Sequence, residues 1–293
     1  MLIADVRTRP VHHQRLTPAW LDQVCRDALE RESDAWPKPG LVTPVDPGSH
    51  RDMNHVTFVR SIASLHGYFA EIAAAAADPI APPLSVLQAI GIRAEARMLA
   101  ATGGKNTHRG AIFNLGLLSA ACAYRQHAPA LHYLTCGAVV AQTWGMAILN
   151  GPCDKALSSH GERMRQRYGS GGARQEAAAG FPSVYSIGLP TLRALLSCGT
   201  DQESALIGAL LALMAEVDDT NLLWRGGLSG LRDVQAAATA FNRAGGVMQA
   251  DWREQLLDMH AWMVRRNLSP GGSADLVAAT WLAYRLEAQD TRQ

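Results

Sequence analysis

The feature that most constrains the fold is a long uncharged stretch, from Ser204 to Ala215, that is rich in leucine and alanine. Both residues favour helices, and a helix that is apolar on every side has to be surrounded by other parts of the protein. Helical patterns recur along the chain, whereas alternating β-branched runs with hairpin turns do not. The sequence therefore predicts an all-α protein with this helix near its centre.

The predicted helices are separated by short connections, and no linker or internal repeat divides the chain. They cover residues 18–32, 56–77, 84–101, 111–126, 130–149, 203–217, 230–244, 252–266 and 273–287. The stretch 126–153 has no charged residue but contains histidine, proline and amide side chains, so we expect a buried helix rather than a membrane span. We predict one multi-helix domain over residues 1–293.

Composition excludes several classes of protein. The 27 basic and 26 acidic residues nearly cancel, which argues against a nucleic-acid-binding or membrane-surface protein. The five cysteines form no C-x-x-C pair, which is typical of free thiols in a reducing compartment. The first fifteen residues lack the apolar core of a signal peptide. We therefore expect a cytoplasmic protein.

Several connections between helices combine glycine with charged or amide residues, and such loops commonly carry functional sites. They are residues 36–41, 46–53, 102–110, 169–177, 218–227 and 267–276. The loop 102–110, TGGKNTHRG, superficially resembles a phosphate-binding P-loop. It lacks the first glycine of that motif, where Leu99 stands, and its hydroxyl residue, where Asn106 stands. It is therefore not a P-loop.

Carboxylates mark two of the helices. Glu216, Asp218 and Asp219 gather where the uncharged helix ends, and the negative end of a helix dipole disfavours them. Either Mg²⁺ or Arg225 could compensate, or Asp219 could instead cap the next helix. Glu95 lies towards the apolar side of its helix, as a catalytic acid, a metal ligand or a partner in an ion pair would.

Three further loops contain polar groups suited to anions or to helix ends. Ser49 is a candidate N-cap beside His50 and Asp52, and a glycine pair precedes Arg174 and Glu176. In NLSPGGSADL, Ser273 and Asp275 are fully explained as cap and first turn of a helix, while Gly271 and Gly272 would let backbone approach a ligand.

Taken together, these motifs resemble the triphosphoribosyl-dephospho-CoA synthase family. The matching segments are KPGLV at 38–42, GSHRDM at 48–53, Phe58 with Ser61, AEARM at 94–98, NTHRGAIFNLG at 106–116, GGARQEAAAGFP at 171–182, DDTNLLWRGG at 218–227 and NLSPGGSADL at 267–276. They follow the family's order across nearly the whole chain. The chain most resembles the member that serves malonate decarboxylase, and the citrate lyase counterpart shares the motifs.

The resemblance implies a transferase. The 2′-hydroxyl of 3′-dephospho-CoA attacks the anomeric carbon of ATP, adenine leaves, and the triphosphate stays on the ribose. The product is passed to a phosphoribosyl-dephospho-CoA transferase that acts on an acyl-carrier protein. Two alternatives are a Mg²⁺-dependent helical glycohydrolase, with water as acceptor, and a non-enzymatic assembly factor.

The resemblance also implies roles for the motif residues. Asp218 and Asp219 would hold Mg²⁺ on the triphosphate, and Glu95, Asp52 or Glu176 would act as base or stabilise the ribosyl cation. The remaining candidates would bind the nucleotide: Lys38, Ser49, His50, Asn106, Thr107, His108, Arg109, Arg174, Asn221, Arg225, Gly271 and Gly272. Lys105 stands where the family commonly has an apolar residue, so it inherits no role.

Overall fold

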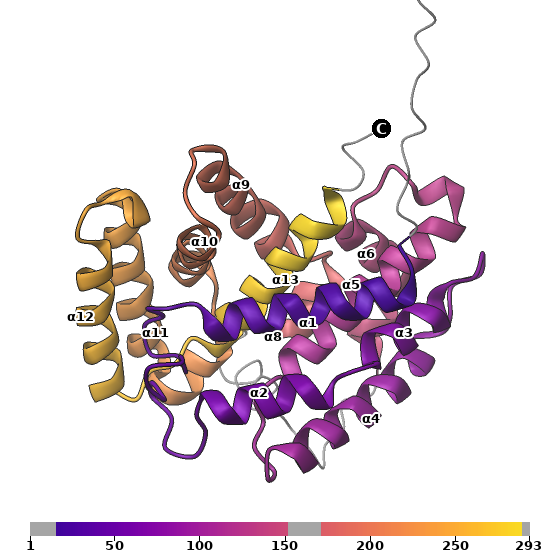
Figure 1. Cartoon of the computed structure of the whole chain (residues 1–293). Coiled ribbons are helices and arrows are strands. Elements are labelled where there is room, and N and C mark those ends of the chain that lie inside the picture. Colours follow the sequence, from indigo (N-terminus) through magenta and orange to yellow (C-terminus); the bar gives the residue numbers. More distant parts are fainter. Residues whose placement is uncertain (1–15, 152–170, 289–293) are drawn as a thin grey trace, which may run out of the picture.

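The structure is a computed structural model that describes residues 16–151 and 171–288. Every regular element in this part of the chain is helical, which confirms the all-α prediction (Figure 1). The α-helices are α1 (Pro18–Asp34), α2 (His55–Ser64), α3 (Tyr68–Ala76), α4 (Leu84–Ala101), α5 (Arg109–His127), α6 (Cys136–Asn150), α8 (Gly172–Ala178), α9 (Leu189–Ser197), α10 (Gln202–Glu216), α11 (Thr220–Arg243), α12 (Trp252–Arg265) and α13 (Gly271–Glu287). Short turns of other helical types are η1 (Pro129–Leu131), η3 (Val184–Gly188) and η4 (Gly246–Met248).

Helix α10 is the predicted uncharged helix, and it is central as expected. Nearly all residues from Ser204 to Met214 are buried, and α9, α11 and α13 pack around it. Helices α5 and α13 are buried almost as completely, and they pack against each other. Figure 1 shows α1 in indigo alongside the yellow α13, with α11 and α12 at the side opposite α3 and α4.

The buried apolar side chains form one continuous cluster that extends from Leu21 in α1 to Leu286 in α13. A single core that includes every long helix agrees with one domain over the described residues. The extension of that domain to residues 1–293 stays a prediction.

Local backbone chemistry explains where the predicted helices differ from the observed ones. The predicted helix 56–77 is interrupted at Gly67, whose φ of 80° is incompatible with a helix, so α2 and α3 are separate. The predicted helix 130–149 begins later, because Thr135 caps α6 through the Ala138 N–H at 3.1 Å. Helix α9 was not predicted, and α11 starts earlier than expected and bends at Gly227.

Ser49 does not cap a helix, contrary to the sequence-based expectation. Helix α2 begins at His55, and Asn54 is its N-cap, with its side chain accepting a hydrogen bond from the Thr57 N–H at 3.1 Å. The loop that contains Ser49 is therefore not part of a helix and contacts other loops.

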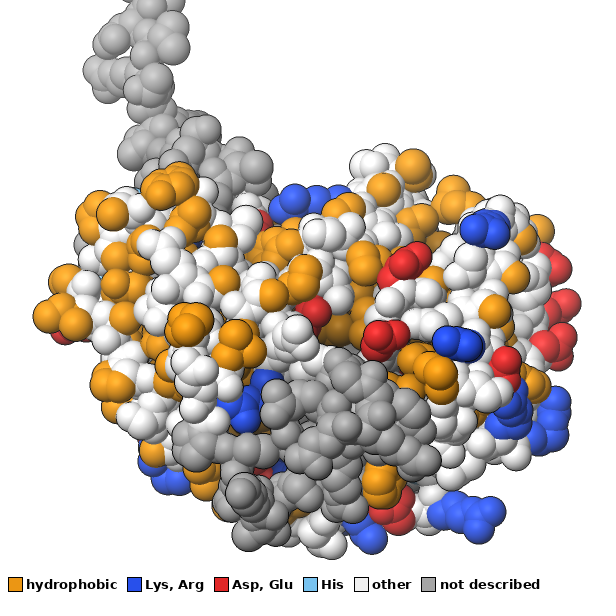
Figure 2. Space-filling model, turned by 180° about the vertical axis from the view of Figure 1, so that it is seen from behind, with side chains coloured by type: hydrophobic (Ala, Val, Ile, Leu, Met, Phe, Trp, Pro, Cys, Tyr) orange, Lys and Arg blue, Asp and Glu red, His pale blue; other side chains and the backbone are white. Residues whose placement is uncertain are grey.

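The surface is not uniform. Figure 2 shows hydrophobic side chains gathered on the half of the molecule that carries α3, α4 and α6. Charged side chains are more frequent on the half that carries α11 and α12. Among the described residues, no helix combines the length and the apolar character needed to cross a membrane.

The thiols of Cys25, Cys122, Cys136 and Cys198 are free, as predicted. Cys153 and residues 1–15, which were expected not to be a signal peptide, lie outside the described residues.

Candidate active site

The amino-terminal ends of α11 and α13 meet at the carboxylate of Asp219, which is only 1% exposed. Its Oδ1 accepts hydrogen bonds from the Asn221 N–H at 2.8 Å and the Leu222 N–H at 3.3 Å. Its Oδ2 accepts from the Ser273 N–H at 2.7 Å and the Ser273 hydroxyl at 3.0 Å. Burial raises the pKa of Asp219, and these hydrogen bonds oppose the rise. Asp219 is therefore the N-cap of α11, and protein donors occupy both of its oxygens.

Gly271 and Gly272 let α13 approach α11 closely. A Cβ atom on Gly271 would lie 2.7 Å from the Asn221 Nδ2, and one on Gly272 would lie 3.1 Å from the Asp219 Oδ2. The sequence suggested that these glycines admit a ligand to the backbone. The structure shows instead that they admit two side chains from α11.

Helix α5 reaches the same region through Asp275. Contrary to the sequence-based expectation, Ser273 is not the cap of α13 and Asp275 is not in its first turn, because α13 already begins at Gly271. The Ala111 N–H donates to the Asp275 carboxyl group, and a Cβ atom on Gly110 would lie 1.9 Å from the Asp275 Oδ2. Burial raises the pKa of Asp275 well above its usual value, and the negative charges of Glu32 and Asp219 raise it further. Asp275 therefore holds a proton to a higher pH than an ordinary aspartate does.

Three helices thus begin in one region. Helices α5 and α13 contain 19 and 17 residues, and the first segment of α11 runs from Thr220 to the break at Gly227. Asp219 links the starts of α11 and α13, and Asp275 links α13 to the first turn of α5. The first N–H groups of a helix lack partners within the helix, and the helix dipole adds partial positive charge at this end. The region where the three helices begin, called here the helix-start region, is therefore suited to anionic groups such as phosphates.

Lys38 is buried beside the helix-start region, but it faces α1 rather than a ligand. Its ammonium group donates to the Glu32 Oε1 at 2.7 Å and to the backbone oxygens of Glu32 and Ser33. The charge of Lys38 is thus matched by Glu32 and by the negative end of α1. This arrangement does not support the phosphate-binding role that the sequence suggested.

Glu95 and Arg109 form an ion pair between α4 and α5. Their side chains are 27% and 39% exposed, so the pair lies at the edge of the helix-start region, where a substrate can reach it. The Asn106 Oδ1 accepts a hydrogen bond from the Arg109 N–H at 3.2 Å, and α5 begins at Arg109, two residues before the predicted start at 111. Of the alternatives considered for Glu95, the structure shows an ion pair with another helix.

Asp52 and Lys105 connect two neighbouring loops. The Lys105 Nζ lies 3.7 Å from the Asp52 Oδ2, and both side chains are exposed. Exposed pairs at this distance contribute little to stability. The contact nevertheless places the loop 46–53 beside the connection between α4 and α5.

Arg225 anchors the loop 46–53 to the connection that precedes α13. Its guanidinium donates to the Ser49 carbonyl oxygen at 2.9 Å and to the His50 Nδ1 at 3.2 Å. The Ser49 hydroxyl donates to the Leu268 carbonyl oxygen, and the His50 Nε2 lies 3.1 Å from the Ser269 hydroxyl. Burial, and then the charge of Arg225, lowers the pKa of His50 to about 4. His50 is therefore uncharged at neutral pH and cannot neutralise a phosphate as a cation.

Thr107 and His108 are held against α2. The Thr107 hydroxyl donates to the Ser61 Oγ at 2.7 Å, and the Ser61 Oγ lies 2.6 Å from the His108 Nδ1. Burial, together with the positive charge of Lys38, lowers the pKa of His108 to about 3. His108 is therefore a neutral imidazole at the start of α5.

The side chains of Arg174 and Glu176 cap other elements. The Arg174 guanidinium donates to carbonyl oxygens at the end of α6, including that of Gly151 at 3.0 Å. The Glu176 carboxylate accepts from the Ser183 N–H at 2.7 Å and from the Ser183 hydroxyl at 3.0 Å. Burial raises the pKa of Glu176, and the bonds from Ser183 oppose the rise. Neither contact supports the phosphate-binding and catalytic roles suggested for these two residues.

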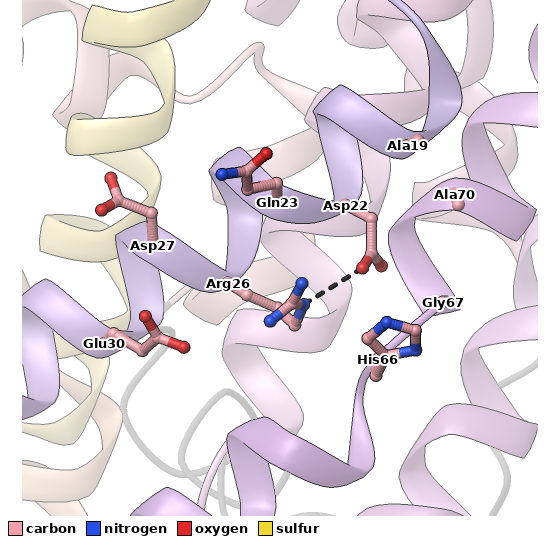
Figure 3. Close-up of a pocket in the computed structure, with 9 residues that line it drawn as sticks. All are labelled: Ala19, Asp22, Gln23, Arg26, Asp27, Glu30, His66, Gly67 and Ala70. Carbon is pink, nitrogen blue, oxygen red and sulfur yellow. Dashed lines mark hydrogen bonds and ion pairs between the residues drawn. The ribbon is translucent and has the colours of Figure 1, made fainter.

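A separate surface pocket of about 490 Å³ lies over α1 and the turn before α3 (Figure 3). Part of its charged lining is already used within the protein: Asp22 pairs with Arg26 at 3.1 Å, and Asp27 accepts from the Trp281 indole N–H at 2.9 Å. The pocket contains none of the candidate residues. We therefore place the candidate active site at the helix-start region.

Comparison with known proteins agrees with the motifs. The sequence profile of the CitG family, described as ATP:dephospho-CoA triphosphoribosyl transferase, matches residues 18–293. The chain belongs to this family.

Members of this transferase family resemble the chain over most of its length. A probable 2-(5′′-triphosphoribosyl)-3′-dephosphocoenzyme-A synthase from Acinetobacter calcoaceticus is 40% identical over 269 residues, which cover 91% of each chain. A probable synthase of the same name from Azotobacter vinelandii is 42% identical and covers 89% of each chain. The 2-(5′′-triphosphoribosyl)-3′-dephosphocoenzyme-A synthase from Pectobacterium atrosepticum is 38% identical, over 93% of this chain and 91% of its own. No solved structure matches the chain.

The chain is accordingly an enzyme of the transferase class, and its family uses ATP and dephospho-CoA as substrates. The structure adds Asp275, Glu32 and Ser61 to the residues of interest. Asp275 was set aside because its position in a first turn explains an aspartate without any site. The signal that could have found it is Gly110, a glycine inside a helix that leaves room for a neighbouring side chain.

Proposed function

We propose that this enzyme transfers the triphosphoribosyl group of ATP to the 2′-hydroxyl of 3′-dephospho-CoA at the helix-start region, with release of adenine. The observation that carries the proposal is that α5, α11 and α13 begin around two linked buried carboxyl groups, Asp219 and Asp275, and that the pKa of Asp275 is raised well above its usual value. The partial positive charge at the helix starts suits the triphosphate, and a carboxyl group with a raised pKa suits a leaving base.

Asp275 is the proposed general acid. Adenine is a poor leaving group unless a proton or a hydrogen bond relieves the charge that develops on it. The raised pKa of Asp275 keeps the proton available, and the Ala111 N–H holds the carboxyl group in place.

Glu95 is the proposed base for the attacking hydroxyl. It is the one of the three candidate carboxylates that both faces the start of α5 and is held by a cation there, Arg109. The Asp52 carboxylate is paired with Lys105, and the Glu176 carboxylate is used in a cap. Arg109 also has further N–H donors for a phosphate: its Nε is buried and lacks a hydrogen-bond partner among the described residues.

Magnesium is expected to arrive with the triphosphate, and Asp218 fits it better than Asp219. Asp218 is exposed and lies 3.5 Å from the Gln235 amide, whereas both oxygens of Asp219 already accept two hydrogen bonds each. A Mg²⁺ ion on a nucleotide commonly needs only one or two carboxylates in addition to phosphate and water. Bound there, the ion would neutralise charge on the triphosphate.

Mass spectrometry of reactions with ATP, Mg²⁺ and 3′-dephospho-CoA tests the proposal. We expect free adenine and triphosphoribosyl-dephospho-CoA only when both substrates are present. Adenine release that is the same with and without dephospho-CoA would instead indicate a glycohydrolase. No release of adenine under either condition would indicate an assembly factor.

A matched pair of variants tests the site. Asp275→Asn should lower turnover by about 10²–10⁴-fold, the range for loss of a general acid. Asp258→Asn makes the same change on the exposed face of α12 and should leave turnover unchanged. Equal activity of the two variants would reject Asp275 as the acid.

We further propose that the enzyme is cytoplasmic and that its product serves the acyl-carrier subunit of malonate decarboxylase. The overall form of the chain supports this choice, because the citrate lyase counterpart shares the motifs. To test this choice, the product is supplied to the apo acyl-carrier proteins of malonate decarboxylase and of citrate lyase, each with the downstream phosphoribosyl-dephospho-CoA transferase of its own system. Deletion of the gene for this enzyme should abolish malonate decarboxylation but not citrate cleavage. The reverse result would assign the product to citrate lyase instead.

A further inference from the structure

His108 contains a buried polar atom without a partner. The residue is 2% exposed, and its Nε2 has no hydrogen-bond partner among the described residues. A buried donor left unsatisfied costs about 1–3 kcal/mol, so an atom of this kind calls for an explanation.

The contacts of Ser61 determine which nitrogen of His108 carries the proton. The Thr107 hydroxyl donates to the Ser61 Oγ at 2.7 Å, so the single proton of Ser61 remains for another acceptor. Among the described residues, the His108 Nδ1 at 2.6 Å is the acceptor available to it. The Nδ1 therefore accepts, and the proton of the neutral ring lies on the Nε2.

The surroundings keep the ring neutral and fixed in place. Phe58 packs edge-on against it, with ring centroids 5.0 Å apart, and the buried Lys38 ammonium disfavours a second positive charge. His108 is also the residue directly before α5, between the Asn106 cap and Arg109. Its unpartnered N–H is thus at the start of one of the three helices of the site.

We propose that Thr107 and Ser61 fix His108 as its Nε2–H tautomer, so that the neutral imidazole donates a hydrogen bond to an oxygen of the nucleotide substrate. The identity of that nucleotide as ATP rests on the proposed function. His108 touches the substrate, whereas Ser61 and Thr107 are positioning residues that act through it. A neutral imidazole donates without changing charge, and such donors can stabilise an oxygen in an active site.

The tautomer is measured directly by ¹⁵N NMR on the full chain labelled at histidine, with His108→Gln used to assign the signal. We expect a protonated Nε2 and an unprotonated Nδ1 in the wild type, a mixture of tautomers in Ser61→Ala, and the wild-type pattern in Ser64→Ala. Ser64 is the matched control, because it is on the same helix and its hydroxyl donates to the Ser61 carbonyl oxygen at 2.6 Å. A protonated Nδ1 in the wild type would overturn the inference.

Addition of ATP without dephospho-CoA tests the donor role. The Nε2–H proton should move downfield as ATP binds, and no movement while calorimetry detects binding would overturn the donor role. If calorimetry detects no ATP binding, the proposed function fails, and the tautomer measurement still decides whether Ser61 sets the ring.

Two substitutions of His108 provide the kinetic test. Glutamine places an amide N–H near the former Nε2, whereas asparagine reaches only the former Nδ1. We expect His108→Gln to retain at least about a tenth of kcat and His108→Asn to lose about 10²–10³-fold, the loss typical of a donor used in the transition state. If His108 had only a structural role, kcat would fall equally in both variants, and that result would contradict the proposal.

Discussion

Gly110→Ala gives a sharp test of the site, because the clash that it creates is directed at Asp275. The added Cβ would lie 1.9 Å from the Asp275 Oδ2 and 2.8 Å from its Cγ. Ordinary contacts between these atoms are roughly 3.5 Å, so the carboxyl group has to move by more than about 1 Å. A displacement of about 1 Å at a reacting group can reduce the rate about 10²-fold.

The same substitution should change stability much less than it changes activity. Alanine gains up to about 1 kcal/mol of helix propensity over glycine, and overpacking costs about 1–3 kcal/mol. The net loss is therefore about 0–2 kcal/mol, measured by urea unfolding followed by circular dichroism. Adenine release, measured by chromatography, should fall by about two orders of magnitude.

Gly91→Ala is the matched control, since it makes the same change inside α4. A Cβ there would meet only the Tyr68 hydroxyl oxygen at 3.7 Å, an ordinary contact. We expect this variant to gain up to about 1 kcal/mol and to keep its turnover. If Gly110→Ala is folded and turns over like Gly91→Ala, the Asp275 carboxyl group is not at the reaction centre.

Three further predictions separate structural from catalytic roles. Asp219→Asn should lose about 1–3 kcal/mol in urea unfolding, because an amide cannot accept all four hydrogen bonds, whereas Asp218→Asn should keep its stability and need more Mg²⁺ for turnover. Equal stability of these two variants would contradict the N-cap role. Arg174→Gln should lower the melting temperature, because the carbonyl oxygens at the end of α6 lose their donor, and it should leave the KM for ATP within about twofold of the wild-type value. A large rise in KM would indicate that Arg174 binds phosphate after all. The pKa of His108 is about 3 when folded and 6.5 when unfolded, so the unfolded chain binds the proton first as pH falls, and stability present above pH 6.5 is lost towards pH 3. Between pH 7 and pH 5 the free energy of unfolding of the wild type should fall by about 2 kcal/mol because of this group, and that of His108→Gln should not show this loss. Equal pH dependence of unfolding in the two proteins would contradict the lowered pKa of His108.

The helices could be predicted because their signals are local. The uncharged stretch 204–215 predicted a buried helix, and the observed α10 covers Gln202–Glu216. The failures are local as well. Gly67 lies inside an otherwise helical pattern, and its positive φ was not anticipated.

The roles of the charged residues could not be predicted in this way. Arg174 is charged and follows a glycine pair, as a phosphate-binding residue would be, but carbonyl oxygens more than twenty positions away occupy its guanidinium. Glu95 was predicted with open alternatives, and only the position of α5 shows that its partner is Arg109.

The sequence by itself determined the all-α fold, the central uncharged helix and, through the order of its motifs, the family. The tertiary structure decided the surroundings of the carboxyl groups: Asp219 is used as a cap, and burial raises the pKa of Asp275 well above its usual value. The reason is physical, because a helix depends on neighbours within a few positions, whereas a pKa depends on burial and on charges from distant parts of the chain. Ser273, which is 54 positions from Asp219, and Glu32 at the end of α1 set the environment of these two acids.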